Sequence, residues 1–349
     1  MRGVLALLPG LLVGALLALP ADTGTAAEPA AAATGSAPSY ARRPEVRKFI
    51  REMVRRHGFV ESELVYLFSR ARRVDPILQA ISAPAEKVRS WKEYREILVS
   101  EKRLAGGLEF WNAHRAALER AQREFGVPAE YIVAIIGVET LYGQNTGRYR
   151  VIDALATLAF DYPPRSEFFR EELVSYLLLA RDEGLNVFAT KGSYAGALGI
   201  PQFMPGSARR YAVDFDGSGA IDLHRSPVDA VGSVANFLKR HGWAPGEPVL
   251  LNARVSGTEY AQYATGGLEP KVTVATLAAA GVLPEGPLSG ELASQRAALV
   301  ELATPGEPSE FRIGLHNFYV ITRYNRSALY ASAVCDLAKA LRAAQEPGR

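Results

Sequence analysis

Apolar side chains recur with the period of an α-helix along most of the chain between Pro44 and Trp243. The clearest stripe precedes Gly58 and is formed by Val46, Phe49, Ile50, Met53 and Val54. Residues three and four positions apart share one face of a helix, so this spacing predicts helices that each bury one side. A capping box at Ser90–Glu93 and a stripe over Leu108–Phe125 predict two more helices. The chain is expected to be mainly α.

After Trp243 the pattern changes. Short runs of β-branched and aromatic residues stand between glycine and proline turns, at Val249–Val255, Lys271–Leu277 and Phe311–Thr322. Such runs are typical of strands. We therefore predict a small antiparallel β subdomain followed by a last helix over Ser327–Ala344, which makes the fold class mainly α with a minor β part (α+β).

Composition excludes several classes of protein. Apolar residues make up 48% of the 349 residues and charged residues 22%, which is ordinary for a folded chain. The net charge of +3 comes with no block of Lys and Arg, so nucleic acid is not an expected partner. A single cysteine, Cys335, rules out an internal disulfide, and the five histidines are scattered without zinc-binding spacing.

The first residues are typical of an export signal. Met1–Arg2 is followed by an apolar run to Leu19 and by small residues up to Ala27, which predicts a signal peptide over 1–27 and a flexible linker over 28–42. An uncleaved membrane anchor is the alternative interpretation. No cysteine stands near the end of the apolar run, so we expect a periplasmic protein that is not a lipoprotein.

One glutamate stands on an apolar stripe. In the predicted helix that starts at Pro128, Ile132, Ile135 and Ile136 precede Glu139 by seven, four and three positions, which places the carboxyl group on their face. Partial desolvation there would raise its pKa, as a general acid requires. The alternative is a glutamate at a helix end that reaches water.

Glycine-rich segments follow. Gly143 and Gly147 flank a loop, and the stretch 192–205 combines glycine with polar and aromatic residues. Glycine lets the backbone approach a ligand closely, although close packing between helices requires small residues as well.

Six motifs together resemble one family. They read GVETLYG, DALATLAFDYP, GSYAGALGIPQFMPGS, YAVDFDGSGAIDL, GSVANFLKRHGW and NFYVITRYNRS, and they lie in order between about Arg43 and Leu341. This chain is similar to the lytic transglycosylase B family of peptidoglycan-cleaving enzymes (glycoside hydrolase family 103). The resemblance implies a lysozyme-like catalytic core over 126–243, an added N-terminal helical region over 43–125, and the β subdomain with the last helix over 244–349.

The resemblance also implies a reaction. Such enzymes cleave the β-1,4 bond between N-acetylmuramic acid and N-acetylglucosamine without water, and the muramoyl 6-hydroxyl closes onto C1 as a 1,6-anhydro ring. Glu139 would first act as the acid and then as the base. The expected partners are peptidoglycan glycan strands and other cell-wall enzymes, and the expected state is a monomer.

Further residues are carried over by motif. Those expected to bind substrate are Tyr94, Arg165, Ser193, Gln202, Tyr324 and Asn325. Three positions depart from the family pattern: Pro164 replaces an arginine, and Phe168 and Phe237 replace tyrosines. These departures leave the chemistry intact and affect recognition of the peptide stem. For each single contact, packing without ligand binding is the alternative.

The segment 214–229 follows the first half of an EF-hand loop. Oxygen-bearing side chains occupy its positions 1, 3 and 5, glycine occupies the sharp turn, and the expected ligands are Asp214, Asp216, Ser218, the Ala220 carbonyl and Asp229. Position 12 is Arg225 rather than Glu, and the family's longer loop implies Asp229 instead. We expect a weakly bound structural calcium ion and no cofactor for catalysis. Ordinary Asx turns, with Asp229 completing a capping box begun by Ser226, are the alternative.

Two other functions stay open on the residues alone. A lysozyme-type hydrolase of the same polymer would need a second carboxylate, for which Asp153 and Asp161 are candidates, although Asp153 is better interpreted as a helix cap. A non-catalytic peptidoglycan-binding protein would not need Glu139. Products with an anhydro end would distinguish the transglycosylase from the hydrolase.

Overall fold

The computed structural model describes residues 39–82 and 89–346. The predicted signal peptide and residues 28–38 of the predicted linker lie outside the described residues. Tyr40–Arg42 form a short 3₁₀ helix, η1, in which Tyr40 and Ala41 are buried. Residues 39–42, the last four of the predicted linker, therefore belong to the described part of the second unit.

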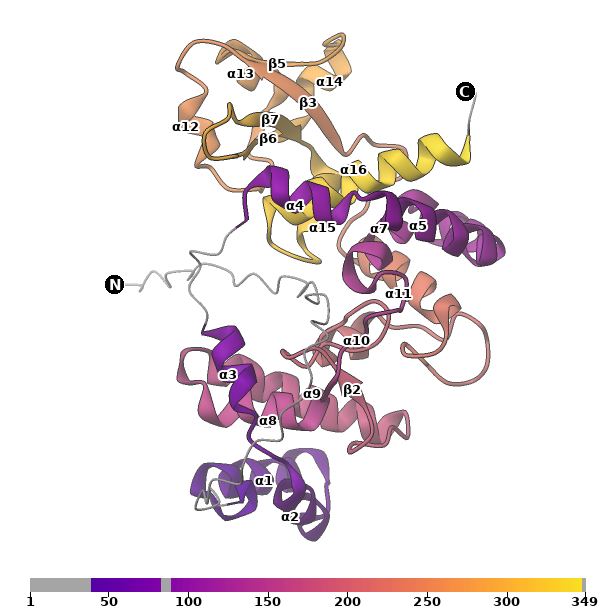
Figure 1. Ribbon diagram of the computed structural model, residues 1–349, viewed down its shortest axis with the longest axis vertical. Coiled ribbons are helices and arrows are strands. Elements are labelled where there is room, and N and C mark those ends of the chain that lie inside the picture. The colour runs from indigo at the N-terminus through magenta and orange to yellow at the C-terminus, as the bar shows by residue number, and fades with distance from the viewer. Residues whose placement is uncertain (1–38, 83–88, 347–349) are drawn as a thin grey trace, which may run out of the picture. The chain divides into compact units, whose positions relative to one another are not determined.

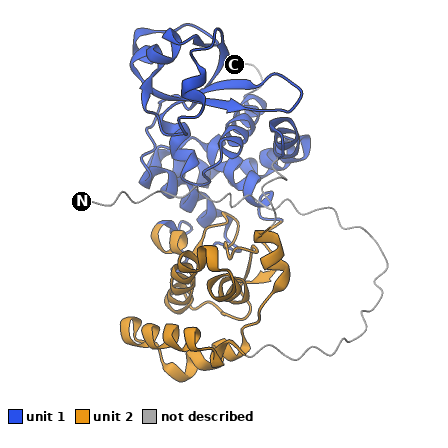
Figure 2. Ribbon diagram, turned by 90° about the vertical axis from the view of Figure 1, so that its left-hand side faces the viewer, with its two compact units in different colours: residues 1–15, 85–144, 211–349 blue, residues 16–84, 145–210 orange. Residues whose placement is uncertain are grey.

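The chain divides into two compact units, coloured separately in Figure 2. The described part of the first unit is 89–144 and 211–346, and that of the second is 39–82 and 145–210. Each unit thus combines segments that are distant in sequence. The sequence-based segments 43–125, 126–243 and 244–349 stay predictions.

The second unit is built mainly from helices, with one pair of two-residue strands (Figure 1). Its elements are η1, α1 (Pro44–His57), α2 (Glu61–Arg70), α3 (Asp75–Ile81), β1 (Tyr149–Arg150), α8 (Val151–Asp161), η3 (Pro163–Arg165), α9 (Ser166–Asp182) and β2 (Lys191–Gly192). The predicted stripe on α1 is buried at Val46, Phe49, Ile50 and Met53. Phe49, Phe68 and Phe160 meet edge to face in this core. Helix α10 (Pro205–Tyr211) closes the segment 145–210, and its last residue is the first of the segment 211–346.

The first unit contains the remaining helices outside the sheet. They are α4 (Trp91–Leu98), α5 (Glu101–Ala113), α6 (Arg115–Phe125), α7 (Ala129–Thr140), α11 (Pro227–Arg240), α15 (His316–Thr322) and α16 (Ala328–Gln345). The capping box at Ser90 is confirmed. The Ser90 hydroxyl accepts the Glu93 amide, and the Glu93 carboxylate accepts the Ser90 amide. The predicted single helix over 108–125 is wrong: the helix breaks at His114, whose φ of −116° is not helical.

A five-stranded antiparallel sheet belongs to the first unit, with strand order β4-β6-β7-β3-β5. Its strands are β3 (Leu250–Val255), β4 (Val272–Thr273), β5 (Val282–Pro284), β6 (Arg296–Leu302) and β7 (Glu310–Gly314), with α12 (Ala261–Ala264), α13 (Val274–Ala279) and α14 (Gly290–Ser294) between them. The core of the subdomain is formed by Val274, Leu277, Val282, Ala297, Leu299, Ile313 and Leu315.

Two of the three predicted strands are partly wrong. Only Val272–Thr273 of the run 271–277 pairs as a strand, because the Thr273 hydroxyl accepts the Thr276 amide and starts α13. Strand β7 ends at Gly314, and the residues from His316 onward form α15. The mainly α fold with a small antiparallel sheet is confirmed. Among the described residues, no helix is long and apolar enough to span a membrane.

Candidate active site

Helix α7 carries Glu139 at its C-terminal end. Ile132, Ile135 and Ile136, the predicted neighbours on its face, are fully buried. The helix packs against α5, α11 and α16, and its residues from Ile132 to Val138 are all apolar, as expected for a helix inside a unit. Glu139 itself is half-buried, unlike the fully buried isoleucines on its face.

Tyr330 is the hydrogen-bond donor to this carboxyl group. Its hydroxyl lies 2.7 Å from Glu139 Oε1. Tyr330 stands in the first turn of α16, where the Ser327 hydroxyl accepts its amide, and its side chain is fully buried. No sequence motif singles out Tyr330, which lies six residues beyond Tyr324 and three beyond the end of the last motif.

Burial determines the acidity of Glu139. Desolvation raises the pKa of Glu139 from 4.5 to about 7, and the hydrogen bond from Tyr330 acts in the opposite direction because it stabilises the ionised form. Near neutral pH the group can therefore exist as an acid and as a base. A carboxyl group in this state suits proton transfer in both directions.

Two further tyrosines of the first unit lie near this carboxyl group. Burial and, to a smaller extent, the negative charge of Glu139 together raise the pKa of Tyr94 to about 12. The same two causes hold the pKa of Tyr324 well above its usual value. The rings of Tyr324 and Tyr330 are stacked at 6.5 Å, with an angle of 12° between their planes. Asn325 is buried beside Tyr324. Tyr94 and Tyr324 thus lie near enough to Glu139 for its charge to act on both hydroxyl groups.

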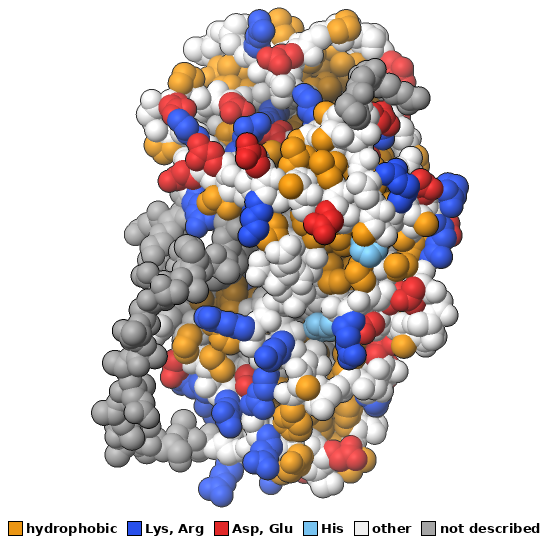
Figure 3. Space-filling view, turned by 45° about the vertical axis from the view of Figure 1, so that its right-hand side comes forward, with side chains coloured by type: hydrophobic (Ala, Val, Ile, Leu, Met, Phe, Trp, Pro, Cys, Tyr) orange, Lys and Arg blue, Asp and Glu red, His pale blue; other side chains and the backbone are white. Residues whose placement is uncertain are grey.

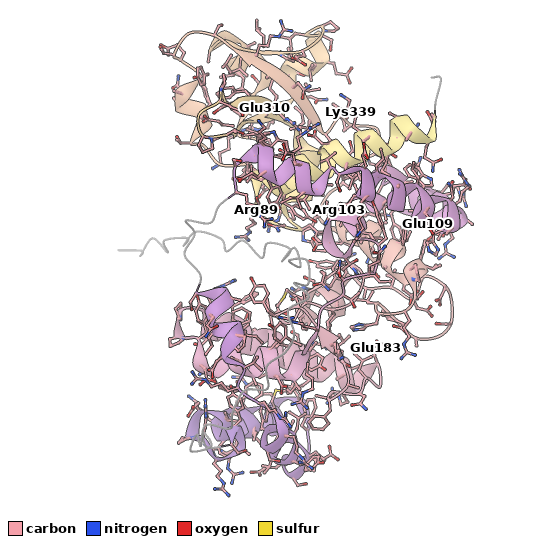
Figure 4. All side chains as sticks on the ribbon, viewed as in Figure 1. Arg89, Arg103, Glu109, Glu183, Glu310 and Lys339 are labelled. Carbon is pink, nitrogen blue, oxygen red and sulfur yellow. The ribbon has the colours of Figure 1, made fainter. Side chains whose placement is uncertain are left out.

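The end of α7 has an unusual backbone. Leu141 and Tyr142 both adopt left-handed conformations, with φ of 51° and 60°, followed by Gly143 at 87°. The Tyr142 hydroxyl donates to the Arg103 carbonyl at 2.7 Å, and its ring fills the space left by Gly137. Arg103 (labelled in Figure 4) donates from Nε to the Gly137 carbonyl at 3.2 Å. These contacts fix the turn that follows Glu139.

The glycine-rich stretch 192–205 belongs to the second unit. The Ser193 hydroxyl accepts the Ala197 amide at 3.0 Å. Gln202 adopts φ of 50°, and its Nε2 donates to the carbonyls of Thr146 at 3.1 Å and Gly199 at 2.8 Å. A Cβ at Gly147 would overlap the Gly192 backbone. Both predicted side chains therefore help to hold this loop in its shape.

Arg165 lies in the second unit at the end of η3. Its guanidinium stacks over the rings of Phe168 at 4.3 Å and Phe169 at 5.4 Å. Burial lowers its pKa. Its buried Nη1 has no hydrogen-bond partner among the described residues. A half-buried cation with a free donor is suited to an anionic ligand.

The predicted metal loop gathers three carboxylates. Oxygen atoms of Asp214, Asp216 and Asp229 all lie within 4.8 Å of one another. Asp229 is fully buried, and its carboxylate accepts the amides of Phe215, Asp216 and Asp222 at 2.7, 3.1 and 2.9 Å. The Ser226 hydroxyl caps α11 by accepting the Asp229 amide. One half of the alternative capping box, the bond from the Asp229 amide to the Ser226 hydroxyl, is therefore present. The other half is absent, because the Asp229 carboxylate accepts amides of the loop and not the Ser226 amide.

The rest of the loop also presents oxygen atoms. The Ser218 hydroxyl donates to the Ala220 carbonyl at 3.1 Å, and the Asp214 carboxylate accepts the amides of Gly217, Ser218 and Gly219. The Ser226 hydroxyl donates to Asp216 and lowers the pKa of that carboxyl group. Asx turns are therefore present. The donor set consists of oxygen atoms alone, which is the set that Ca²⁺ prefers.

The chain is similar to proteins of known activity. The family model described as Transglycosylase SLT domain (SLT_2) matches residues 41–339. Membrane-bound lytic murein transglycosylase B of Escherichia coli (strain K12) is 43% identical over 313 residues, which cover 86% of this chain and 84% of that protein.

Solved structures agree with this similarity. Catenated lytic transglycosylase SltB1 from Pseudomonas aeruginosa has a TM-score of 0.83 at 48% identity and matches 88% of this chain and 100% of that one. Escherichia coli lytic transglycosylase Slt35 in complex with calcium has a TM-score of 0.79 at 43% identity, over 88% and 95%. SltB3 from Pseudomonas aeruginosa in complex with NAG-anhNAM-pentapeptide has a TM-score of 0.77 at 31% identity, over 88% and 80%.

Proposed function

Because this chain belongs to the transglycosylase SLT domain family, we propose that Glu139 is the single acid and base with which it cleaves peptidoglycan. The protein is a lytic murein transglycosylase, a lyase that breaks the β-1,4 bond between N-acetylmuramic acid and N-acetylglucosamine. The observation that carries the assignment to Glu139 is its desolvated carboxyl group, with a pKa raised to about 7, on an apolar helix.

In the first step the protonated Glu139 carboxyl donates its proton to the glycosidic oxygen as the bond to C1 breaks. The N-acetylglucosamine end leaves as an alcohol, and positive charge develops at C1 of the muramoyl sugar. The carboxylate that results is stabilised by the hydrogen bond from Tyr330.

In the second step the Glu139 carboxylate takes the proton from the muramoyl 6-hydroxyl, whose oxygen attacks C1. The 1,6-anhydro ring closes and Glu139 is protonated again, so no water is consumed. One carboxyl group suffices because the nucleophile belongs to the substrate and is delivered intramolecularly.

The two carboxylates considered for a hydrolase are engaged elsewhere within the second unit. Asp153 accepts the Arg72 amide at 2.9 Å and pairs with Arg150 at 2.7 Å. It is the third residue of α8 and not its cap, which is a correction of the sequence interpretation. Asp161 accepts the Tyr40 hydroxyl and pairs with Arg43 at 2.8 Å. These contacts favour structural roles for both.

We also propose the substrate contacts carried over by motif. Tyr94, Tyr324 and Asn325 would bind sugar near Glu139, and Ser193 and Gln202 would bind the muramoyl sugar. The free donor of Arg165 supports a role in binding a lactyl or peptide carboxylate. Packing is the competing role for Ser193 and Gln202, since their side chains already bond the loop.

A structural calcium ion is proposed for the loop over 214–229. The three clustered carboxylates fit it, and the Slt35 relative is in complex with calcium. Asp214, Asp216, Ser218, Ala220 and Asp229 would hold the ion and join the loop to the start of α11. No cofactor is proposed for the chemistry.

The substrate is the cell wall, so we propose that the chain is exported to the periplasm. The apolar run at the N-terminus supports this. The absence of lipid modification stays a prediction, and the Escherichia coli relative is named as membrane-bound. A monomeric state and interactions with other cell-wall enzymes stay predictions as well.

The products of digestion in ¹⁸O-labelled water test this reaction. Mass spectrometry of fragments from purified glycan strands should show anhydro ends without label, because the oxygen at C1 comes from the substrate. A hydrolase would place label at C1, since water attacks directly or resolves an intermediate. Labelled reducing ends as the main product would contradict the proposal.

A further inference from the structure

Positive charge is concentrated at the start of the described chain. Residues 40–82 contain ten Lys and Arg against five Asp and Glu, a net charge of +5, whereas the entire chain carries +3. All of these residues belong to the second unit. Basic side chains gather in the lower part of the view in Figure 3, where α1 and α2 lie.

Helix α1 presents the densest part of this charge. At about 100° per residue, Arg47, Arg51, Arg55 and Lys48 fall within an arc of about 100° on one face of the helix. Arg47, Arg51 and Arg55 form a row about 12 Å long, one helical turn apart. All four side chains are exposed, and we call this set the cationic face of α1.

The charges of this face are largely unpaired. Arg47 lies 4.0 Å from Glu61, at the limit of an ion pair. Lys48, Arg51 and Arg55 form no ion pair with any residue that the structure describes. Four like charges on adjacent turns repel one another, and in an isolated helix such pairs are destabilising. An anionic partner would relieve this repulsion.

The opposite face of α1 is not available to a partner. Val46, Ile50 and Met53 are fully buried in the second unit. A helix that binds a membrane in the interfacial manner inserts its apolar side. Because that side of α1 is used in the core, the cationic face can act only through charge and hydrogen bonds. Insertion into a bilayer is therefore excluded, and the four charges are suited to a partner that carries repeated anions.

We propose that the cationic face of α1 binds the carboxylates of peptidoglycan stem peptides and so retains the enzyme on its substrate polymer. The inference rests on the proposed function, since it takes peptidoglycan as the partner. The face is distinct from the residues proposed for sugar binding. Each stem peptide that is not cross-linked ends in a free carboxylate, so a row of guanidinium groups meets repeated anions along a strand.

The test measures binding without cleavage. Glu139→Gln protein is sedimented with purified peptidoglycan sacculi at low salt, with and without four substitutions: Arg47→Gln, Lys48→Gln, Arg51→Gln and Arg55→Gln. A matched control removes three arginines and one lysine from exposed positions of the first unit, by Arg123→Gln, Arg240→Gln, Arg254→Gln and Lys271→Gln. Circular dichroism verifies the folding of each variant.

We expect affinity for sacculi to fall about tenfold in the α1 variant and much less in the control. The difference should disappear at high salt, and also with sacculi whose stems an amidase has removed. Equal losses in both variants, or a loss that persists without stems, would overturn the proposal. So would unchanged sacculus binding with reduced binding to phosphatidylglycerol vesicles, which would indicate a membrane partner.

The result is independent of the catalytic assignment. In the active enzyme, the four α1 substitutions should leave cleavage of a short stem-free glycan fragment unchanged and slow the release of fragments from intact sacculi. If Glu139→Gln protein still cleaved the short fragment, the proposed function would fail. Sedimentation at 4 °C, with the sacculi assayed for released fragments, would still report whether the face binds stems.

Discussion

The raised pKa of Glu139 makes the stability of the fold depend on pH. Its folded-state pKa of about 7 exceeds the ordinary 4.5, so the folded protein binds this proton more tightly than the unfolded chain does. The stabilisation that protonation provides is present below pH 4.5 and is lost as the pH rises through 7. Over that window the free energy of unfolding should fall by about 3 kcal/mol, at 1.36 kcal/mol per pKa unit.

Glu139→Gln should therefore separate activity from stability. Glycan cleavage should fall at least about a hundredfold, because the amide has no transferable proton. The free energy of unfolding, measured with urea at pH 4 and pH 8, should rise relative to the parent only at pH 8. A variant that retains parental activity, or that is less stable at pH 8, would contradict the role assigned to this carboxyl group.

Tyr330 is expected to adjust the acidity of Glu139. Its hydrogen bond stabilises the carboxylate, so Tyr330→Phe should raise the pKa of Glu139. A hydrogen bond to a charged group contributes about 1.5–3 kcal/mol, so the alkaline limb of the kcat/KM profile should move up by about one pH unit or more. Tyr94→Phe also removes a tyrosine hydroxyl and serves as the control. The prediction fails if the alkaline limb of the kcat/KM profile lies at the same pH in both variants and in the parent.

At the scale of the element, the end of α7 depends on close packing. A Cβ at Gly137 would lie 2.6 Å from Cζ of Tyr142, whose left-handed backbone leaves the ring little freedom to move. Because Tyr142 holds the turn after Glu139, a shift of its ring would also displace the catalytic carboxyl group.

Gly137→Ala should accordingly destabilise the protein by about 1–3 kcal/mol, as expected for overpacking. Gly290→Ala, in α14, places a methyl group in open space and should change stability by less than about 0.5 kcal/mol. Thermal unfolding of the two variants provides the comparison. Equal melting temperatures would show that the Tyr142 ring can move without cost.

Sequence patterns predicted α7 better than the sheet. The three isoleucines before Glu139 stand at helical spacing, which indicates a buried helix face. The helix, this face and the raised pKa of Glu139 could therefore be predicted. In the run 271–277 the β-branched Val272, Thr273 and Val274 indicate a strand, but a single hydroxyl cap at Thr273 turns the chain into α13. The β-propensity of these residues does not predict whether the chain continues as a strand or starts a helix after Thr273.

The acidic site shows the same limit. Tyr330 contacts Glu139 across 191 residues of sequence, and nothing in the spacing of either residue indicates the pairing. The division into units was equally inaccessible, because each unit combines two segments of the described chain. Long-range contacts of this kind arise from tertiary packing and leave no local period.

At the scale of the whole molecule, the proposed calcium loop and the tryptophans belong to the same unit. Asp214, Asp216 and Asp229 belong to the first unit, and so do all three tryptophans of the chain, Trp91, Trp111 and Trp243. Tryptophan fluorescence therefore reports unfolding of the first unit, whereas circular dichroism reports the helices of both. The two signals can be followed in the same thermal experiment.

Excess calcium should raise the melting temperature seen by fluorescence. A ligand that binds only the native state stabilises it by about 2.7 kcal/mol at 100 times its Kd, which corresponds to about 5–10 °C for a unit of this size. Asp214→Ala should abolish the increase, and Asp182→Ala, an exposed change in the second unit, should preserve it. The calcium is first removed with a chelator and then added back. If the melting temperature seen by fluorescence does not change, the carboxylates of the loop form Asx turns and do not bind calcium.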